Sequence, residues 1–168
     1  MILLGREIKD ILVSSYFHAT KRSFVFEGTI SEFIRTDRFG ALKILEFYEL
    51  WLQSKHRAER FLFLRYEDMH QDPKTSLIKV LEFIGERDID ENIVEQSVEY
   101  CSFVHLRKLE TQDRFKKSAL RVRDAEDPES YKTRKGKVGG YKDYLSDEDQ
   151  AFVDEVIKDR NFDFAKFA

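Results

Sequence analysis

Residues 134–140 read Arg-Lys-Gly-Lys-Val-Gly-Gly and combine three cationic side chains with three glycines. Cationic side chains attract an anion, and glycine lets backbone N–H groups approach it closely. The segment is therefore a candidate anion-binding loop. It does not match the phosphate-binding pattern G-x-x-x-x-G-K-S/T, which occurs nowhere in the chain. A solvated, flexible basic loop remains open as the alternative.

Arg6 and Ser14 form a second candidate anion site. Arg6 directly follows an apolar run that predicts a strand, and ligands of open α/β sheets bind at the carboxyl ends of strands. Ser14 lies about two helical turns further along. A guanidinium binds phosphate oxygens in a bidentate manner, and a hydroxyl adds a second donor. The alternative is that Arg6 pairs with Glu7 or Asp10 and that Ser14 has no role.

Apolar patterning predicts an α/β fold in which helices dominate. Two short, continuous apolar runs, 2–4 and 61–64, predict buried strands, and such continuity is typical of parallel strands covered on both faces. Apolar residues at helical spacing, with caps, predict helices over 8–19, 29–36, 40–56, 73–84, 90–98 and 103–109, and one that begins after Ser146. The helix over 40–56 has a wide apolar face that we expect to be well buried. The phenylalanines of the tail, residues 162–167, are expected to dock on the core.

Residues 111–142 differ from the rest of the chain. They are hydrophilic, with little periodicity, and contain Pro128 and three of the seven glycines. A loop of this length inside a compact domain is usually functional or disordered. Residues 105–142 carry 12 basic and six acidic side chains, whereas the whole chain has a net charge of −3. This asymmetry favours a local anion site and argues against a nucleic-acid partner.

Length and composition exclude several classes of protein. A chain of 168 residues is about one domain. Its 15 Phe and 7 Tyr exclude an intrinsically disordered chain, and a single cysteine excludes a disulfide framework or a multi-cysteine zinc site. No apolar run approaches the ~18 residues of a membrane span, and the charged start does not resemble a signal peptide. We therefore expect a soluble, cytoplasmic protein without a metal or a membrane partner.

Three segments, in this order, resemble the cytosolic-type sulfotransferase family. Residues 6–14 resemble its R-x-x-K-D-x-x-V-S segment. Residues 66–85 contain Tyr-Glu-Asp-Met and end on Leu-Glu-Phe-Ile-Gly, like the family's Y-E-D-M helix. Residues 134–139 resemble its R-K-G-x-x-G loop. The resemblance implies a P-loop NTPase-like α/β fold, a three-layer parallel sheet with helices on both faces. Here it would form a single, partial domain over 1–168 that lacks the first strand and the P-loop.

The resemblance also implies a cofactor, 3′-phosphoadenosine 5′-phosphosulfate or its product 3′-phosphoadenosine 5′-phosphate (PAP). Arg6 and Ser14 would hold the 3′-phosphate, together with Arg134, Lys135 and Gly136 of the basic loop. Residues 111–142 would form a loop that covers the cofactor. A tyrosine and the Ser102-Phe103 pair would lie near the adenine, and Cys101 replaces a family threonine. The implied cofactor-binding residues are Arg6, Ser14, Tyr66, Ser102, Phe103, Arg134, Lys135 and Gly136.

The departures from the family concern the chemistry. The family's Lys-Ser-Gly-Thr-Thr loop, which carries a catalytic lysine, and its catalytic histidine have no counterpart in this sequence, where both would precede Met1. None of the four histidines occupies that position. We therefore expect no catalytic residue in this chain, weak nucleotide binding and little or no turnover by the 168 residues alone. The acceptor, a small molecule with a hydroxyl or amine, is not readable from the sequence.

Two other hypotheses belong to different classes. The chain could be a non-catalytic interaction protein in which an open sheet edge pairs with a partner or a second copy. It could also be a kinase-like or RNA-binding module that uses the basic loop. The missing P-loop pattern and the net negative charge argue against the second of these.

Overall fold

The computed structural model describes residues 1–115, 117 and 120–167, so three residues of the loop predicted over 111–142 lie outside the described part. Two strands are present in that part: β1 (Ile2–Gly5) and β2 (Leu62–Arg65). The α-helices are α1 (Ile8–Lys21), α2 (Ile30–Ile34), α3 (Ala41–Ser54), α4 (Tyr66–Gln71), α5 (Pro73–Ile84), α6 (Glu91–Tyr100), α7 (Phe103–Thr111) and α8 (Asp147–Asp159). Short 3-10 turns are η1 (Lys55–Arg57), η3 (Pro128–Ser130), η4 (Gly140–Asp143) and η5 (Phe164–Phe167).

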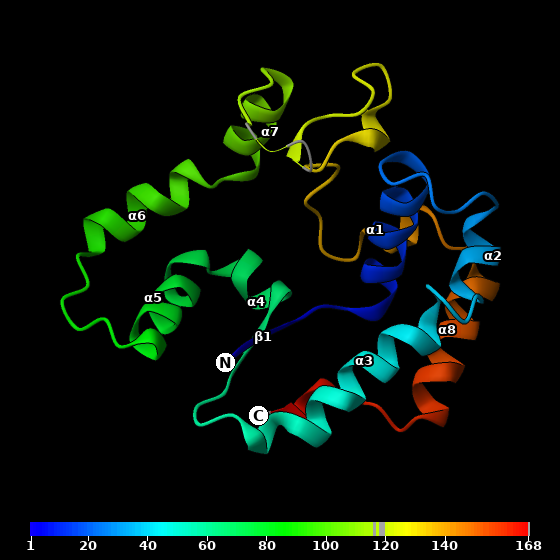
Figure 1. The fold of residues 1–168 in the computed structure, drawn as a ribbon, viewed down its shortest axis with the longest axis horizontal. Helices are drawn as coiled ribbons and strands as arrows, with labels where there is room; N and C mark the ends of the chain where they lie inside the picture. The colour runs from blue at the N-terminus through cyan, green and yellow to red at the C-terminus, as the bar shows by residue number, and fades with distance from the viewer. Residues whose placement is uncertain (116, 118–119, 168) are drawn as a thin grey trace.

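The two strands lie at the centre of a helix-rich molecule (Figure 1). They pair in parallel, with Ile2 opposite Leu62 and Gly5 opposite Arg65. Helices α1, α2, α3 and α8 gather on one side of β1, and α4, α5 and α6 lie on the other (Figure 1). Because both strands run in one direction, their carboxyl ends meet at one edge of the sheet, where α1 and α4 begin.

One face of β1 is buried and the other is open. Leu3 and Gly5 face the core, whereas Ile2 and Leu4 keep 41% and 47% of their surface exposed. The continuous apolar run predicted burial on both faces. The parallel pairing is confirmed, but Ile2 and Leu4 on the second face are only about half covered. The prediction and the structure differ because an apolar run shows only that burial would be favourable. Whether a face is buried depends on another helix or strand packing on it, which the run does not specify.

The core lies between α1, α2, α3, α8 and the tail. Its fully buried side chains include Leu12, Phe33, Leu45 and Val153. The tail docks as expected, since Phe164 and Phe167 are buried. Helix α3 buries Leu45 and Tyr48, whereas Phe47 on the neighbouring stripe keeps 49% of its surface exposed.

Local capping signals correctly predicted several helix ends. The Asp72 carboxylate accepts a hydrogen bond from the backbone N–H of Thr75 at 3.0 Å, and Pro73 occupies the first helical position of α5. Gly85 ends the same helix in the left-handed conformation, with φ of 98°. Ser102 and Ser146 cap α7 and α8. Of the helices in the described part of the chain, none is long and apolar enough to cross a membrane.

Candidate functional site

Seven of the eight predicted cofactor-binding residues line one cleft of about 290 Å³. They are Arg6, Ser14, Tyr66, Phe103, Arg134, Lys135 and Gly136. The eighth, Ser102, lines an adjoining apolar cavity of about 810 Å³ between α4, α5, α6 and α7. The two spaces share Tyr66, Phe103 and Gly136. Residues from five separate segments thus converge at the carboxyl edge of the sheet.

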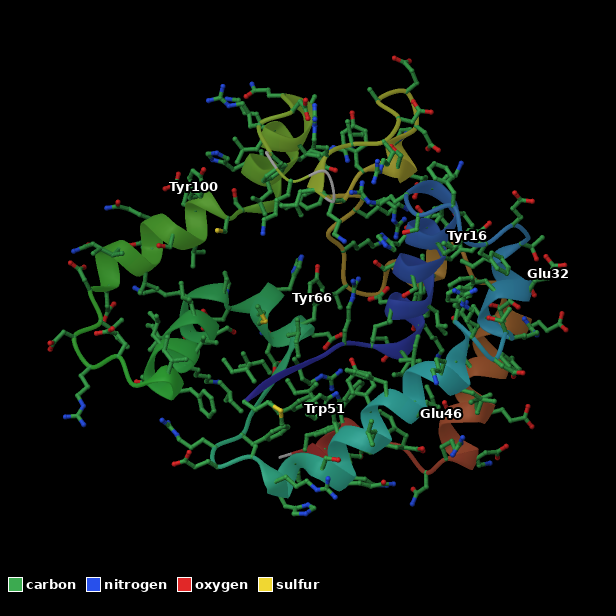
Figure 2. All side chains as sticks on the ribbon, viewed as in Figure 1. Tyr16, Glu32, Glu46, Trp51, Tyr66 and Tyr100 are labelled. Atoms are coloured by element: carbon green, nitrogen blue, oxygen red, sulfur yellow. The ribbon has the colours of Figure 1, made fainter. Side chains whose placement is uncertain are left out.

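The parallel register places Arg6 beside Tyr66. Gly5 pairs with Arg65, so the residue that follows each strand emerges at the same level. The guanidinium carbon of Arg6 lies 4.2 Å from the centroid of the Tyr66 ring, a cation–π contact. Figure 2 shows Tyr66 near the centre of the molecule, where α4 begins.

Arg6 retains an unused hydrogen-bond donor in the cleft. Its Nη2 lies 3.8 Å from Oδ2 of Asp10, so the ion pair that the alternative interpretation predicted is present. Its Nε is buried and has no hydrogen-bond partner among the residues that the structure describes. A buried donor without a partner costs about 1–3 kcal/mol, which an anion in the cleft would recover.

Asp10 ties the glycine-rich segment to α1. Its Oδ2 accepts a hydrogen bond from the backbone N–H of Gly139 at 2.8 Å, and its Oδ1 accepts one from Tyr141 at 2.9 Å. The residue is only 2% exposed. Sequence reasoning considered Asp10 only as a partner of Arg6, and the four-residue spacing on a helix was the available signal. Its hydrogen bonds to Gly139 and Tyr141 join positions about 130 residues apart, and nothing in the neighbouring sequence predicts them.

The predicted cations Arg134 and Lys135 line the cleft while holding partners within the loop. Arg134 Nη1 donates to Glu129 Oε2 at 2.9 Å and to the Tyr144 hydroxyl at 2.7 Å. Lys135 Nζ donates to Asp143 Oδ2 at 3.0 Å. Hydrogen bonds with Tyr144 and Asp143 raise the pKa of Lys135, so it is cationic at neutral pH. Arg134 and Lys135 are therefore held in place by acidic and hydroxyl groups of the same segment and its flanks.

A buried carboxylate fixes the start of the basic segment. Glu110, at the end of α7, is 0% exposed. It accepts hydrogen bonds from the backbone N–H groups of Lys132 and Thr133, at 2.5 and 2.8 Å, and from the Thr133 hydroxyl at 2.6 Å. It also lies 3.7 Å from Nη1 of Arg22, which is itself buried. Glu110 thus holds the two residues that directly precede Arg134.

Gly136 lets the loop approach α7 closely. Its φ is +57°, a conformation that favours glycine, and a Cβ here would collide with the Phe103 ring. Its carbonyl lies 2.7 Å from Nε2 of His70 on α4. The absence of a side chain at 136 therefore lets the loop, α4 and α7 meet around the cleft.

Four further residues of the basic segment line the cleft: Lys132, Thr133, Lys137 and Gly140. Sequence reasoning did not assign them individually, although their place in the basic segment was visible. Among the described lining residues Asp10 is the one acidic side chain, against five cationic ones. A small cleft with this balance, a free buried donor and nearby glycines can bind a multiply charged anion.

Comparison with family models matches residues 1–166 to the sulfotransferase domain. Flavonol 3-sulfotransferase of Flaveria bidentis is 30% identical over 95% of this chain and 54% of its own length. Cytosolic sulfotransferase 10 of Arabidopsis thaliana is 26% identical over 95% of this chain and 49% of its own length. The chain therefore spans about half the length of the curated relatives that it matches.

Solved structures share the fold at low sequence identity. Retinol dehydratase in a complex with retinol and PAP superposes with a TM-score of 0.70 at 22% identity, over 95% of this chain and 46% of that one. Its complex with androsterone and PAP superposes with a TM-score of 0.66 and the same coverage. At this identity the likeness establishes the fold alone.

Proposed function

The chain belongs to the sulfotransferase domain family, and on this premise we propose that it binds the 3′-phosphoadenosine part of a phosphosulfate donor. The observation that carries the proposal is the convergence of seven predicted residues on one cleft, where the buried Nε of Arg6 has no partner within the described part of the chain. Arg6, Ser14, Arg134, Lys135 and the Gly136 amide would hold the 3′-phosphate. Tyr66, Ser102 and Phe103 would line the adenine. The PAP complexes of the structural relatives support this choice of ligand.

The family's reaction requires more than these residues. When bound, the donor supplies a sulfuryl group whose bond to the 5′-phosphate breaks as a bond to an acceptor oxygen or nitrogen forms, with loss of the acceptor's proton. We propose that this chain contributes nucleotide binding to that reaction, and that its 168 residues alone do not turn over. The sequence supports this, because it contains no counterpart of the family's phosphosulfate loop or catalytic histidine.

We propose that residues 1–168 act as one partial domain of a three-layer sheet architecture, in which 111–142 covers the nucleotide. The anchoring of this segment by Asp10 and Glu110 supports a covering role. We also propose a cytoplasmic setting, which the cytosolic relatives support, and no nucleic-acid partner.

The proposal is tested by calorimetric titration of the chain with PAP and with 5′-AMP. We expect PAP to bind at least about tenfold more tightly, because a charge-assisted contact contributes about 1.5–3 kcal/mol. R6Q should remove most of this preference. The matched control is R87Q, which changes an exposed arginine outside the cleft. Equal binding of the two nucleotides, or a preference that survives R6Q, would contradict the proposal.

A second candidate function is that of a non-catalytic interaction protein completed by another copy. The open face of β1, with Ile2 and Leu4 exposed, favours it, because uncovered apolar strands associate. Sedimentation at increasing concentration measures the association directly. Concentration-dependent dimers that L4K abolishes would support this function, and a monomer at all concentrations would exclude it.

A further inference from the structure

The nucleotide cleft contains an acidic side chain to which the proposed function assigns no part in binding. Asp10 lines the cleft together with Arg6 and Ser14, two of the residues proposed to hold the 3′-phosphate. The three residues follow one another at four-residue intervals, so they share one side of α1 and of the turn before it. A carboxylate between two phosphate-binding groups repels an anion, and its presence here needs a reason.

The Asp10 carboxylate is directed at the backbone of the glycine-rich segment. Its Oδ2 accepts a hydrogen bond from the Gly139 N–H at 2.8 Å, and its Oδ1 accepts one from the Tyr141 N–H at 2.9 Å. Gly139 has a φ of 72° and directly precedes the turn η4. Turns of this kind direct neighbouring N–H groups into one anion-binding concavity. Asp10 fills this concavity, so the chain's own carboxylate stands where a ligand anion would bind.

The same carboxylate holds Arg6. The Nη2 of Arg6 lies 3.8 Å from Oδ2 of Asp10, which is an ion pair but is too long for a hydrogen bond. The contact therefore uses none of the hydrogen-bond donors of the guanidinium. The buried Nε of Arg6 also has no partner among the described residues. Asp10 thus attracts the cation to the cleft and leaves its donors for a phosphate.

Burial makes Asp10 depend on these contacts. The residue is 2% exposed, and a carboxylate buried this deeply must be compensated by the groups that it touches. Those groups are the guanidinium of Arg6 and the N–H groups of Gly139 and Tyr141. They belong to two segments about 130 residues apart. Removal of the carboxylate would therefore release the strand end and the glycine-rich segment from each other.

We propose that Asp10 is a positioning residue that sets the preference of the cleft for a 3′-phosphate. It joins Arg6 to the segment that carries Arg134, so that cations from two distant segments reach one phosphate. Because Asp10 fills the concavity at 139–141, the phosphate binds to Arg6, Arg134 and the Gly136 amide instead. This inference rests on the proposed function and deepens it, because it takes the cleft to hold PAP.

The test compares D10A with D149A by calorimetric titration with PAP and with 5′-AMP. Asp149 is the matched control, because its carboxylate is also buried and accepts two side-chain hydrogen bonds, yet it lies on α8 outside the cleft. We expect D10A to lower the affinity for PAP about tenfold, which corresponds to about 1.4 kcal/mol, and to leave that for 5′-AMP unchanged. D149A should leave the ratio of the two affinities unchanged, as a merely structural role of Asp10 would.

A rescue experiment assigns the effect to the carboxylate itself. Formate can enter the space left in D10A and accept the hydrogen bonds of Gly139 and Tyr141, so it should restore the preference for PAP. Neutral formamide should not, and neither should chloride at the same ionic strength, which only screens the charges.

D10N distinguishes positioning from simple repulsion. It keeps the shape of the side chain but replaces one acceptor oxygen with an NH₂ donor, so it should lose the preference as D10A does. If Asp10 only repelled the phosphate, D10N would bind PAP more tightly than the unmodified chain. Thermal melts of each variant monitor folding.

A measurement on the unmodified chain does not depend on variants that fold. In amide NMR spectra, PAP should shift the signal of Gly136, whereas the amides of Gly139 and Tyr141 should keep their shifts and their protection from hydrogen exchange. Three results would overturn the inference: large PAP-induced shifts at Gly139 and Tyr141, a preference that survives D10A, or a loss that formate does not restore.

The outcomes also separate this inference from the proposed function. A preference for PAP in the unmodified chain that D10A retains rejects the positioning role of Asp10 alone. Equal binding of PAP and 5′-AMP by the unmodified chain rejects the proposed function, and the inference with it.

Discussion

Gly136 is a position at which the backbone of the basic loop lies against the Phe103 ring of α7. We expect G136A to reduce PAP affinity about tenfold or more, because a Cβ forces the loop and the Phe103 ring apart. The positive φ adds about 1–2 kcal/mol of strain to any side chain here. Titration with PAP and a denaturation curve measure the two effects.

Gly85 provides the control for strain alone. It also has a positive φ, but nothing lies within 4 Å of a Cβ at that position, and it caps α5 away from the cleft. G85A should therefore lower stability without changing PAP affinity. An equal loss of PAP affinity in G85A and G136A would show that the contact with Phe103 has no functional role.

Glu110 is the other residue on which the loop depends. E110A should lower the free energy of unfolding by about 3–5 kcal/mol, because it removes three accepted hydrogen bonds and the buried negative charge that lies 3.7 Å from Arg22. E110Q retains an acceptor and should lose less. Denaturant unfolding measures both variants.

The control for Glu110 is a carboxylate in an exposed pair. Glu91 lies 2.9 Å from the Lys74 ammonium, and its side chain is largely solvated. E91A should change stability little, since exposed pairs contribute little. If E110A were as stable as E91A, the buried contacts of Glu110 would not hold the loop.

Residues with a local signature were predictable from the sequence, and residues with distant partners were not. Arg6 and Gly136 stand in recognisable segments, so they could be assigned before their surroundings were known. Asp10 and Glu110 act on backbone groups 129 and 22 residues away. Nothing near them in sequence specifies such contacts, because a carboxylate on a helix more often faces water.

At the scale of elements, α8 docks on α2 through one carboxylate. Asp149 Oδ1 accepts hydrogen bonds from Arg35 Nη1 at 2.5 Å and from the Ser31 hydroxyl at 2.7 Å. Burial alone would raise the pKa of Asp149, but the hydrogen bonds from Arg35, Ser31 and Ser146 outweigh it, and the pKa falls below its ordinary 3.8. The first turn of α8 also favours a negative charge.

This lowered pKa makes the docking sensitive to acid. The unfolded chain binds the proton more readily, so the stabilisation is present above pH 3.8 and is lost as the pH falls through the lower folded value. We expect D149N to lose about 2 kcal/mol at neutral pH and to show a weaker pH dependence below 3.8. Unfolding curves across this range test it, and parallel curves for D149N and the unmodified chain would contradict the assignment.

Helix ends were easier to predict than helix faces. Caps at Asp72, Ser102 and Ser146 depend on two or three neighbouring residues, and the structure has each of them. The second apolar stripe of α3 predicted burial, yet Phe47 is half exposed. A helix face is buried only if another helix or strand packs on it, and the periodicity of apolar residues does not show whether one does.

At the scale of the whole molecule, charge is unevenly distributed. A chain of net charge −3 gathers its cations in the segment that lines the cleft. The sequence predicted this asymmetry, and the family resemblance implied that the segments converge; the strand ends accounted for the position of Arg6 alone. A cavity between α1, α2 and α3 was not predictable, since its walls come from three helices whose relative placement depends on the whole core.

The anchors of the basic segment have a consequence for the speed of binding. Glu110 holds the segment at one end and Asp10 at the other, so the loop is already in place before a nucleotide arrives. Association then needs no prior ordering of the loop. A required conformational change lowers the association rate constant of many complexes. In stopped-flow mixing, the observed rate should rise linearly with PAP concentration in the unmodified chain. In E110A it should level off, because the released loop must first close. A plateau in both proteins would show that the loop still has to fold around its ligand.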